Sequence, residues 1–211
     1  FLRVEVPRAF SQTMEGLGQI SKIVSSMRDF ANPPNRGRCP VDLNRAIENA
    51  ATISRNRWKY VAVMELQLGR ELPMIHGVNA ELNQVFLNLI VNAAQTIQER
   101  QASEECLDPT ADGNPPGVIT IRSRLDFGRV RVEIEDTGLG IAPELEDRVF
   151  DPFFTTREVG SGTGQGLAVA HTVVVKGHGG DIQFESRPGL GTTFVLHFPV
   201  PEENTPDSDP G

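Results

Sequence analysis

The sequence has little of what a nucleic-acid-binding, disulfide-stabilised or membrane-spanning protein needs. Twenty Lys and Arg residues against 28 Asp and Glu residues leave a formal net charge of −8, so a basic surface for coating nucleic acid is not expected. Two cysteines, Cys39 and Cys106, cannot by themselves form a disulfide framework or a zinc site. No apolar run approaches the roughly 18 residues of a membrane span, and no signal peptide opens the chain.

These absences favour a cytoplasmic domain without a nucleic-acid partner. Phe1 is not an initiator Met, so we expect a piece of a longer protein, whose upstream part can carry a membrane anchor. Hydrophobic residues make up 38% of the chain, which suffices to bury a core. Residues 201–211 hold four acidic and no basic residues, and we expect them to be a disordered tail.

The N-terminal part has the pattern of a helix that packs in a bundle. Over residues 8–31, apolar side chains fill the a and d positions of a heptad: Phe10, Leu17, Ile20, Val24, Met27 and Ala31. Pro33 and Pro34 end the pattern. We therefore expect a long bundle-forming helix within residues 1–32 and a linker over 33–40.

A compact unit is expected over residues 41–200. Its pattern predicts helices over 42–56, from Asn79 to about Arg100 and over 166–176, and strands near 60–66, 72–76, 117–125, 129–136, 181–186 and 192–198. Asp126-Phe127-Gly128 would turn a hairpin. Helices and strands in mixed order favour an α/β fold, namely a two-layer α/β sandwich with a mixed, largely antiparallel sheet.

The helix that begins near Asn79 combines an apolar surface with a line of amides. Four neutral polar side chains recur at steps of four, four and three, on one face: Gln84, Asn88, Asn92 and Gln95. A solvated face usually carries Glu and Lys, and a buried amide without a partner costs about 1–3 kcal/mol. We therefore expect these amides to face a polar ligand or a metal.

Asp136 breaks the pattern of its strand. Val130, Val132 and Ile134 alternate with charged residues, so they face the core, and Asp136 shares their parity. A carboxylate that points inward is costly unless something donates to it. An Asp-Thr-Gly turn that caps a strand is the simpler interpretation of this residue taken alone.

A glycine-rich stretch leads into the helix expected over 166–176. Gly160, Gly162, Gly164 and Gly166 leave backbone amides free where a helix begins, which suits phosphate groups. A linker has the same composition, so this stretch alone is weak support for a site.

Together and in this order, the motifs resemble the GHKL (Bergerat-fold) ATPases, and most closely the catalytic domain of two-component sensor histidine kinases. NQVFLNLIVNAAQ is similar to the N box, DTGLG to the first Gly box and VFDPFFTT to the F box. GTGQGLAVA is similar to the second Gly box, and GLGTTFVLHFP to the closing Gly-Thr strand. Residues 1–32 resemble the second helix of the dimerisation and histidine-phosphotransfer hairpin.

The resemblance implies a role for particular residues. Asp136 would accept the amino group of adenine, with Gly140 beneath the ring and Thr192 helping through water. Asn92 would coordinate a Mg²⁺ ion that bridges the phosphates of ATP, and Asn88 would contact phosphate or metal. The other implied nucleotide contacts are Gln95, Gly138, Ile141, Gly162, Thr163, Gly164, Gln165, Gly166 and Leu167.

The segment between Phe150 and Gly164 would be the mobile ATP lid, with Phe153 and Phe154 as packing anchors. Arg157 is a candidate catalytic contact to the γ-phosphate, and an exposed lid arginine is the alternative. Many relatives carry Lys where this sequence has Gln95, which hydrogen-bonds without neutralising charge. The acceptor histidine belongs on a hairpin helix that this chain lacks, and all four of its histidines are interpreted as structural.

The resemblance therefore implies an enzyme that binds Mg-ATP and transfers the γ-phosphoryl group to a histidine outside this chain. Its partners would be its own upstream hairpin and the receiver domain of a response regulator, with a homodimer formed when the hairpin is complete. One alternative is a GHKL ATPase that hydrolyses ATP, but such enzymes carry Glu where this chain has Asn88. The other is a degenerate module for nucleotide binding or dimerisation.

Overall fold

The computed structural model describes residues 37–107, 117–156 and 163–201. The helix expected over 1–32, the first half of the linker and all but the first residue of the acidic tail lie outside these ranges, as do the candidate site residues Arg157 and Gly162. Among the described helices, none combines the length and the hydrophobicity that crossing a membrane requires.

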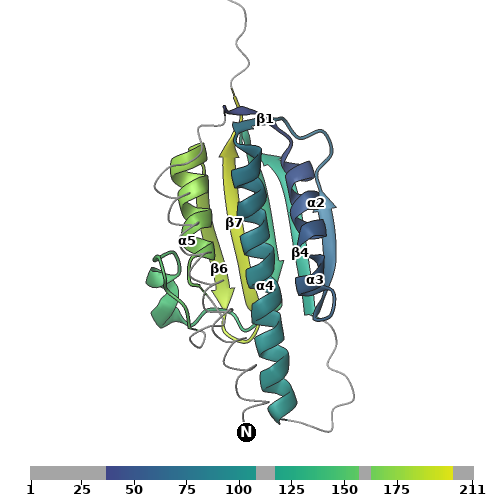
Figure 1. Ribbon diagram of the computed structural model, residues 1–211, viewed down its shortest axis with the longest axis vertical. Helices are drawn as coiled ribbons and strands as arrows, with labels where there is room; N and C mark the ends of the chain where they lie inside the picture. Colours follow the sequence, from purple (N-terminus) through teal and green to yellow (C-terminus); the bar gives the residue numbers. More distant parts are fainter. Residues whose placement is uncertain (1–36, 108–116, 157–162, 202–211) are drawn as a thin grey trace, which may run out of the picture. The chain divides into compact units, whose positions relative to one another are not determined.

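Five strands form one mixed sheet in the spatial order β2–β4–β5–β7–β6 (Figure 1). Their bounds are Ala62–Leu68 for β2, Gly117–Asp126 for β4, Arg129–Asp136 for β5, Asp181–Arg187 for β6 and Gly191–Pro199 for β7. β2 runs parallel to β4, whereas the other three neighbouring pairs are antiparallel. The predicted mixed, largely antiparallel sheet is confirmed.

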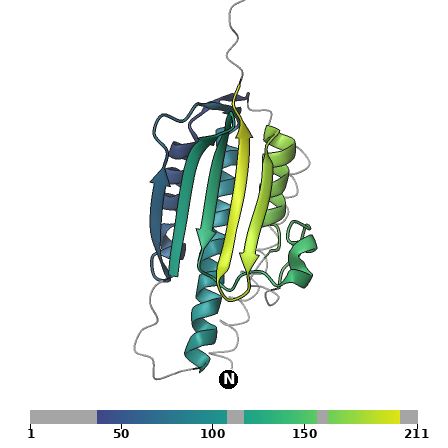
Figure 2. The ribbon, with the colours of Figure 1, turned by 180° about the vertical axis from the view of Figure 1, so that it is seen from behind.

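Helices cover one face of this sheet. α2 (Leu43–Ile53), α4 (Asn79–Leu107) and α5 (Gly166–His171) lie in front of the strands in Figure 1, whereas no described helix covers the face seen in Figure 2. Two further short helical elements are α3 (Arg55–Trp58) and η1 (Pro143–Arg148). The two-layer α/β sandwich predicted from the sequence is therefore confirmed.

α4 supplies the largest share of the core between the two layers. Its buried side chains are each at most 2% exposed and are Leu82, Val85, Phe86, Leu89, Ile90, Ala93, Ala94 and Ile97. They pack over the inward face of the sheet, including Val130, Val132 and Ile134 of β5, as the alternation predicts. The C-terminal turns of α4 extend past the edge of the sheet (Figure 1) and reach Leu107 rather than Arg100.

Two local features differ from the sequence prediction. A strand that was not predicted, β1 (Cys39–Val41), pairs antiparallel with β3 (Ile75–Gly77) in a separate two-stranded sheet. The helix expected over 166–176 is an α-helix only to His171 and continues as a π-helix, η2 (Thr172–Gly177).

Side chains join the end of η2 to the two-stranded sheet. His178 is buried, and its Nε2 accepts a hydrogen bond from the backbone N–H of Val78 at 3.0 Å. Its Nδ1 lies 2.9 Å from the carbonyl oxygen of Val173 and must be the protonated nitrogen, because Nε2 is an acceptor. The guanidinium of Arg38 donates to the carbonyl oxygen of Gly177, so β1 and β3 are both anchored to η2.

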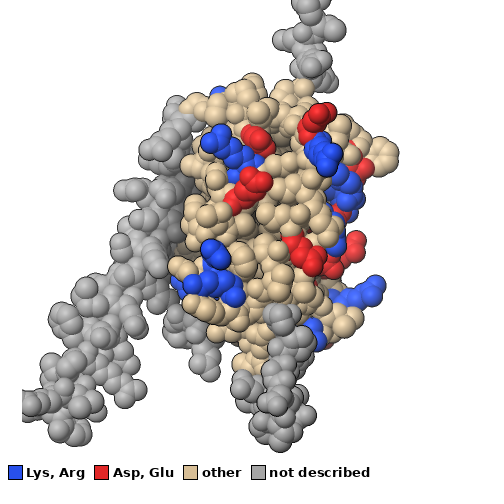
Figure 3. Space-filling view, turned by 90° about the vertical axis from the view of Figure 1, so that its right-hand side faces the viewer, with Lys and Arg blue, Asp and Glu red and all other residues tan. Residues whose placement is uncertain are grey.

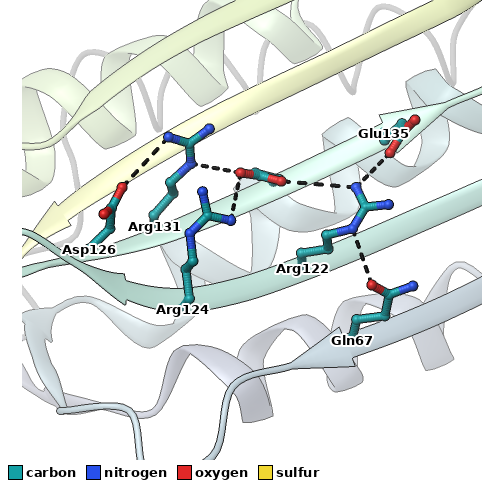
Figure 4. A network of polar contacts seen from close by, with 7 residues as sticks. Gln67, Arg122, Arg124, Asp126, Arg131 and Glu135 are labelled. Atoms are coloured by element: carbon teal, nitrogen blue, oxygen red, sulfur yellow. Dashed lines mark hydrogen bonds and ion pairs between the residues drawn. The ribbon is translucent and has the colours of Figure 1, made fainter.

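The uncovered face of the sheet carries a network of ion pairs, in which Arg122, Arg124 and Arg131 (labelled in Figure 4) surround the carboxylate of Glu133 on β5. One carboxylate oxygen of Glu133 lies 2.9 Å from Arg124 Nη1 and 2.7 Å from Arg131 Nε, and the other lies 3.9 Å from Arg122 Nη1. Only 12% of this side chain is exposed. Arg122 also pairs with Glu135 at 2.6 Å. Positive and negative residues are likewise interspersed on the surface seen from the side of α2 and β2 (Figure 3).

Replacing Glu133 with Gln is expected to lower the free energy of unfolding by about 1–2 kcal/mol, because three guanidinium groups lose their shared counter-charge. Glu135→Gln is the matched control, since that side chain is 43% exposed and pairs with one arginine, and we expect a change below about 0.5 kcal/mol. Urea unfolding at pH 7 measures both. Equal decreases in the free energy of unfolding of the two variants would show that Glu133 stabilises the fold no more than Glu135 does.

Candidate functional site

The predicted amide stripe lies along one side of α4. Nε2 of Gln84 donates to Oδ1 of Asn88 at 2.6 Å, and Nδ2 of Asn88 donates to the backbone carbonyl of Gly166 at 3.1 Å. Asn92 and Gln95 are half-buried farther along the helix. The stripe therefore begins at a direct contact with the glycine-rich loop.

The series of fours continues beyond the residues singled out from the sequence. Thr96 follows Asn92 by four positions and donates through its hydroxyl to Oδ1 of Asp136, at 3.3 Å. Arg100 follows four positions later, and its Nη1 donates to the carbonyl oxygen of Thr137 at 3.0 Å. The i, i+4 pattern of Asn88 and Asn92 extends to both residues, whereas the predicted stripe continued to Gln95, three positions after Asn92.

Asp136 points into the protein, as its parity predicts, and is only 4% exposed. Oδ1 accepts the backbone N–H of Gly138 at 2.8 Å and the Thr96 hydroxyl, and the backbone N–H of Thr192 donates to the same carboxylate. Loss of water through burial outweighs these donors and raises the pKa of Asp136 from 3.8 to about 6; neighbouring Glu135 adds to the rise.

The chain after Asp136 is fixed by contacts with β6 and β7. Gly140 has φ +72°, and a Cβ there would lie 2.2 Å from the carbonyl oxygen of Arg187, so only glycine fits. The hydroxyl of Ser186 on β6 accepts the N–H of Ile141 at 2.8 Å and lies 2.8 Å from the hydroxyl of Thr192. Ser186 thus connects two predicted site residues. No sequence pattern singled it out, because the connection depends on strand register.

The described part of the glycine-rich loop lies against the start of the lid segment. A Cβ at Gly164, which has φ +62°, would lie 2.4 Å from the carbonyl carbon of Phe153. Nearby in sequence, the side-chain amide nitrogen of Gln165 is buried, with no hydrogen-bond partner among the described residues. A buried donor without an acceptor is costly, and an anionic ligand oxygen would satisfy it.

The prediction that Phe153 is a packing anchor is wrong. Phe153 is 52% exposed and adopts φ +67°. Phe150 has that role instead, because its ring packs at 5.8 Å from Phe184 and 6.5 Å from Phe194, with His171 at 5.0 Å. Phe154 lies beneath the guanidinium of Arg148, 4.5 Å from its ring centroid.

The donor set suits a hard cation that is bound together with phosphate. No group of three or more His, Cys, Asp or Glu side chains that could hold a metal occurs among the described residues. Asn88 and Asn92 offer amide oxygens, and Mg²⁺ accepts such ligands when substrate phosphates and water complete its octahedron. The residues present therefore fit a magnesium–phosphate ligand.

The buried carboxylate predicts a specific pH dependence of stability. The pKa of Asp136 in the folded domain lies above its unfolded value, so the empty domain loses stability as pH rises from about 4 through 6. The shift of about two units corresponds to at most about 3 kcal/mol. Asp136→Asn should raise the free energy of unfolding at pH 7.5 by about 1–2 kcal/mol, because one acceptor is lost with the charge.

Urea unfolding of the parent chain and Asp136→Asn between pH 5 and 8 tests this expectation. The difference between the two should grow as pH rises, since other titrating groups cancel in the comparison. A difference that stays constant over the range would contradict the raised pKa.

Comparison with known proteins agrees with this geometry. The sensor histidine kinase ZraS of Escherichia coli is 32% identical over 183 residues, which cover 86% of this chain and 35% of that protein. The histidine-protein kinase AtoS of the same species is 32% identical over 192 residues, covering 90% and 28%. The chain thus spans about a third of the length of these curated relatives.

Solved structures show the same fold. The catalytic domain of histidine kinase ThkA superposes with a TM-score of 0.61 at 25% identity, covering 77% of this chain and 95% of that domain. The mycobacterial sensor histidine kinase MprB gives a TM-score of 0.60 at 25% identity, covering 77% and 97%.

A family model described as "Histidine kinase-, DNA gyrase B-, and HSP90-like ATPase" matches residues 77–202. This range holds all five motifs that carried the resemblance, and the resemblance is confirmed. The chain belongs to this ATPase family, as the ATP-binding catalytic domain of a histidine kinase.

Proposed function

We propose that this chain binds Mg-ATP and transfers the γ-phosphoryl group to a histidine that lies outside it, from which the group passes to an aspartate of a response regulator. The observation that carries the proposal is the convergence of three motifs on one helix. Through Thr96, α4 contacts the inward carboxylate of Asp136, and through Asn88 it contacts the glycine-rich loop at Gly166. A ligand with a base at one end and phosphates at the other matches this arrangement.

The end of the site near Asp136 is proposed to hold adenine. The carboxylate would accept the amino group of the base, and the turn through Gly138, Gly140 and Ile141 would lie along the ring. Thr192 would contribute through water, and its hydrogen-bonded contact with Ser186 supports a fixed orientation. These contacts bind and orient the nucleotide, and positioning supplies much of the acceleration of phosphoryl transfer.

The other end is proposed to hold the phosphates. Thr163 to Leu167 would surround them, and the unpaired amide of Gln165 supports an anion there. Asn92 would be the magnesium ligand, with Asn88 next to it and Gln95 as a hydrogen-bond donor. Mg²⁺ neutralises phosphate charge when bound. Gly162 and Arg157 remain proposed phosphate contacts, Arg157 toward the γ-phosphate.

Transfer is preferred over hydrolysis because the site helix offers no base at position 88. The Asn88 side chain is an amide, and a neutral amide is not basic enough to take a proton from water. Its hydrogen bonds to Gln84 and to the carbonyl oxygen of Gly166 hold it in place on the helix. A nucleophile brought by another polypeptide is then required. We propose the histidine of an upstream hairpin, with a homodimer formed through that hairpin and a receiver domain as the final acceptor.

Incubation of the full chain with γ-labelled ATP and Mg²⁺ tests the proposal, alone and with a polypeptide that carries the histidine-bearing hairpin. We expect acid-labile label on the added polypeptide only, because the acceptor is absent from this chain. Asp136→Asn is the control, and it should transfer far less label, since the amide has one acceptor oxygen instead of two and accepts the adenine amino group more weakly than a carboxylate does.

Two outcomes would contradict this expectation. Steady release of free phosphate by the chain alone, without labelled protein, would identify an ATPase that hydrolyses its substrate. Nucleotide binding that Asp136→Asn does not weaken would support a degenerate module instead.

Asn92→Ala is expected to weaken ATP binding in Mg²⁺ by about tenfold, which equals about 1.4 kcal/mol, while metal-free binding changes less than about threefold. The reason is that the substitution removes a ligand of the metal rather than a contact to the base. Titration calorimetry with and without EDTA measures both affinities. Gln98→Ala, an exposed amide on the same helix, is the matched control. Equal losses with and without metal would exclude a metal-ligand role.

A further inference from the structure

We infer that Thr96, on α4, is the positioning residue that holds the Asp136 carboxylate ready to accept one N–H of the nucleotide base, and so determines the preference for a 6-aminopurine over a 6-oxopurine. The inference rests on the proposed function, because it concerns the same nucleotide. It adds a specificity determinant that neither the motifs nor the resemblance includes.

The first support is the number of donors around the carboxylate. A carboxylate offers about four lone-pair directions. The N–H of Gly138, the hydroxyl of Thr96 and the N–H of Thr192 occupy three of them. One acceptor position is therefore left, and it suits a single N–H donor of a ligand rather than a carbonyl oxygen, which the negative charge would repel.

The second support is the choice of acceptors open to the Thr96 hydroxyl. Its oxygen lies 3.0 Å from the carbonyl oxygen of Ala93 and 3.3 Å from Oδ1 of Asp136, and the group has one proton to donate. With Asp136 ionised, donation to the carboxylate is the stronger bond, because bonds to charged acceptors are about twice as strong. With Asp136 protonated, the hydroxyl can return to the helix carbonyl.

The third support is steric. A Cβ at Gly138 would lie 2.4 Å from Oγ1 of Thr96 and 2.7 Å from Oδ1 of Asp136. The three residues are therefore packed so closely that the hydroxyl, the carboxylate oxygen and the turn hold one another in place. Thr96 fixes the direction of the carboxylate as well as supplying a donor.

The charged groups around Asp136 do little to stabilise its ionised form, so the Thr96 hydroxyl matters more. Glu135 is the next residue on β5 and disfavours the ionised form of Asp136. Arg100 on α4 directs a nitrogen to the backbone of Thr137, and Arg187 at the end of β6 is exposed. Ser186 and Thr192 on β6 and β7 are neutral. Among the ion pairs of the described residues, none involves Asp136, so its hydrogen-bond donors must compensate its charge.

The test compares Thr96→Val, which removes the hydroxyl at nearly constant shape, with Thr96→Ser, which keeps it. Affinities for ATP and for inosine triphosphate are measured in Mg²⁺ between pH 5.5 and 8.5. Inosine triphosphate carries a carbonyl oxygen where ATP carries the amino group. Thr52→Val on α2 is the control, because that hydroxyl also donates to a helix carbonyl oxygen, that of Glu48 at 2.8 Å, but is exposed and is not hydrogen-bonded to Asp136.

For Thr96→Val we expect about a tenfold loss of ATP affinity at pH 7.5. The preference for ATP over inosine triphosphate should also narrow, since a carboxyl that stays protonated can donate to a carbonyl oxygen. The pH at which ATP binding weakens should move upward. Thr96→Ser should restore affinity and preference to within about threefold, and Thr52→Val should change neither.

Three results would overturn the inference: equal losses for both nucleotides, an unchanged pH profile in Thr96→Val, or failure of Thr96→Ser to restore the preference. If Thr96→Val does not fold, as judged by its urea transition, Thr96→Ala replaces it. This variant also lacks the hydroxyl but places no extra methyl group beside the carboxylate, and the same results are expected for it. Binding of neither nucleotide by the parent chain would instead refute the proposed function, which separates the two failures.

Discussion

The structure depends on the cost of placing one carboxylate, that of Asp136, inside the protein. Burial raises its pKa to about 6, so the domain retains a group that weakens it at neutral pH. Three donors from separate parts of the chain partly compensate: Thr96 on α4, Gly138 in the following turn and Thr192 on β7. Helix, turn and sheet are therefore aligned around a single acceptor, and the same alignment leaves one direction open for a ligand.

The two faces of the sheet stabilise their carboxylates differently, one by ion pairs and the other by neutral hydrogen-bond donors. On the uncovered face, Glu133 has three arginines around it, and the network satisfies itself (Figure 4). On the covered face, Asp136 has hydrogen-bond donors and takes part in no ion pair within the described part of the chain. Self-paired charges on one face support the fold, whereas a carboxylate held by neutral donors remains available for recognition. The candidate site therefore lies on the face of the sheet that the helices cover (Figure 1).

Periodic patterns predicted much of the fold and part of the site. Alternation along β5 showed that Asp136 faces inward, and the helical repeat identified the face of Asn88 and Asn92. Contacts between elements were not predictable in this way. Ser186 meets Thr192 through strand register, and β2 pairs with β4 across a helix. Phe153 is exposed, whereas Phe150 packs against other aromatic rings. The two residues lie in the same local sequence pattern, so the sequence alone could not show which of them is the packing anchor.

The parallel pairing of β2 with β4 has a consequence for the order of folding. α4 lies between these strands in sequence, so it is the crossover of a β–α–β unit, and β2 can join the sheet only after that long connection closes. The hairpin of β4 and β5 is local and forms without it. Gly138 reaches Asp136 within this local part, whereas Thr96 and Thr192 arrive from 40 and 56 positions away. The carboxylate therefore acquires its full set of donors only when these long-range contacts have formed. A ligand that requires all of these donors binds only the fully folded domain, and so stabilises it relative to partly folded states.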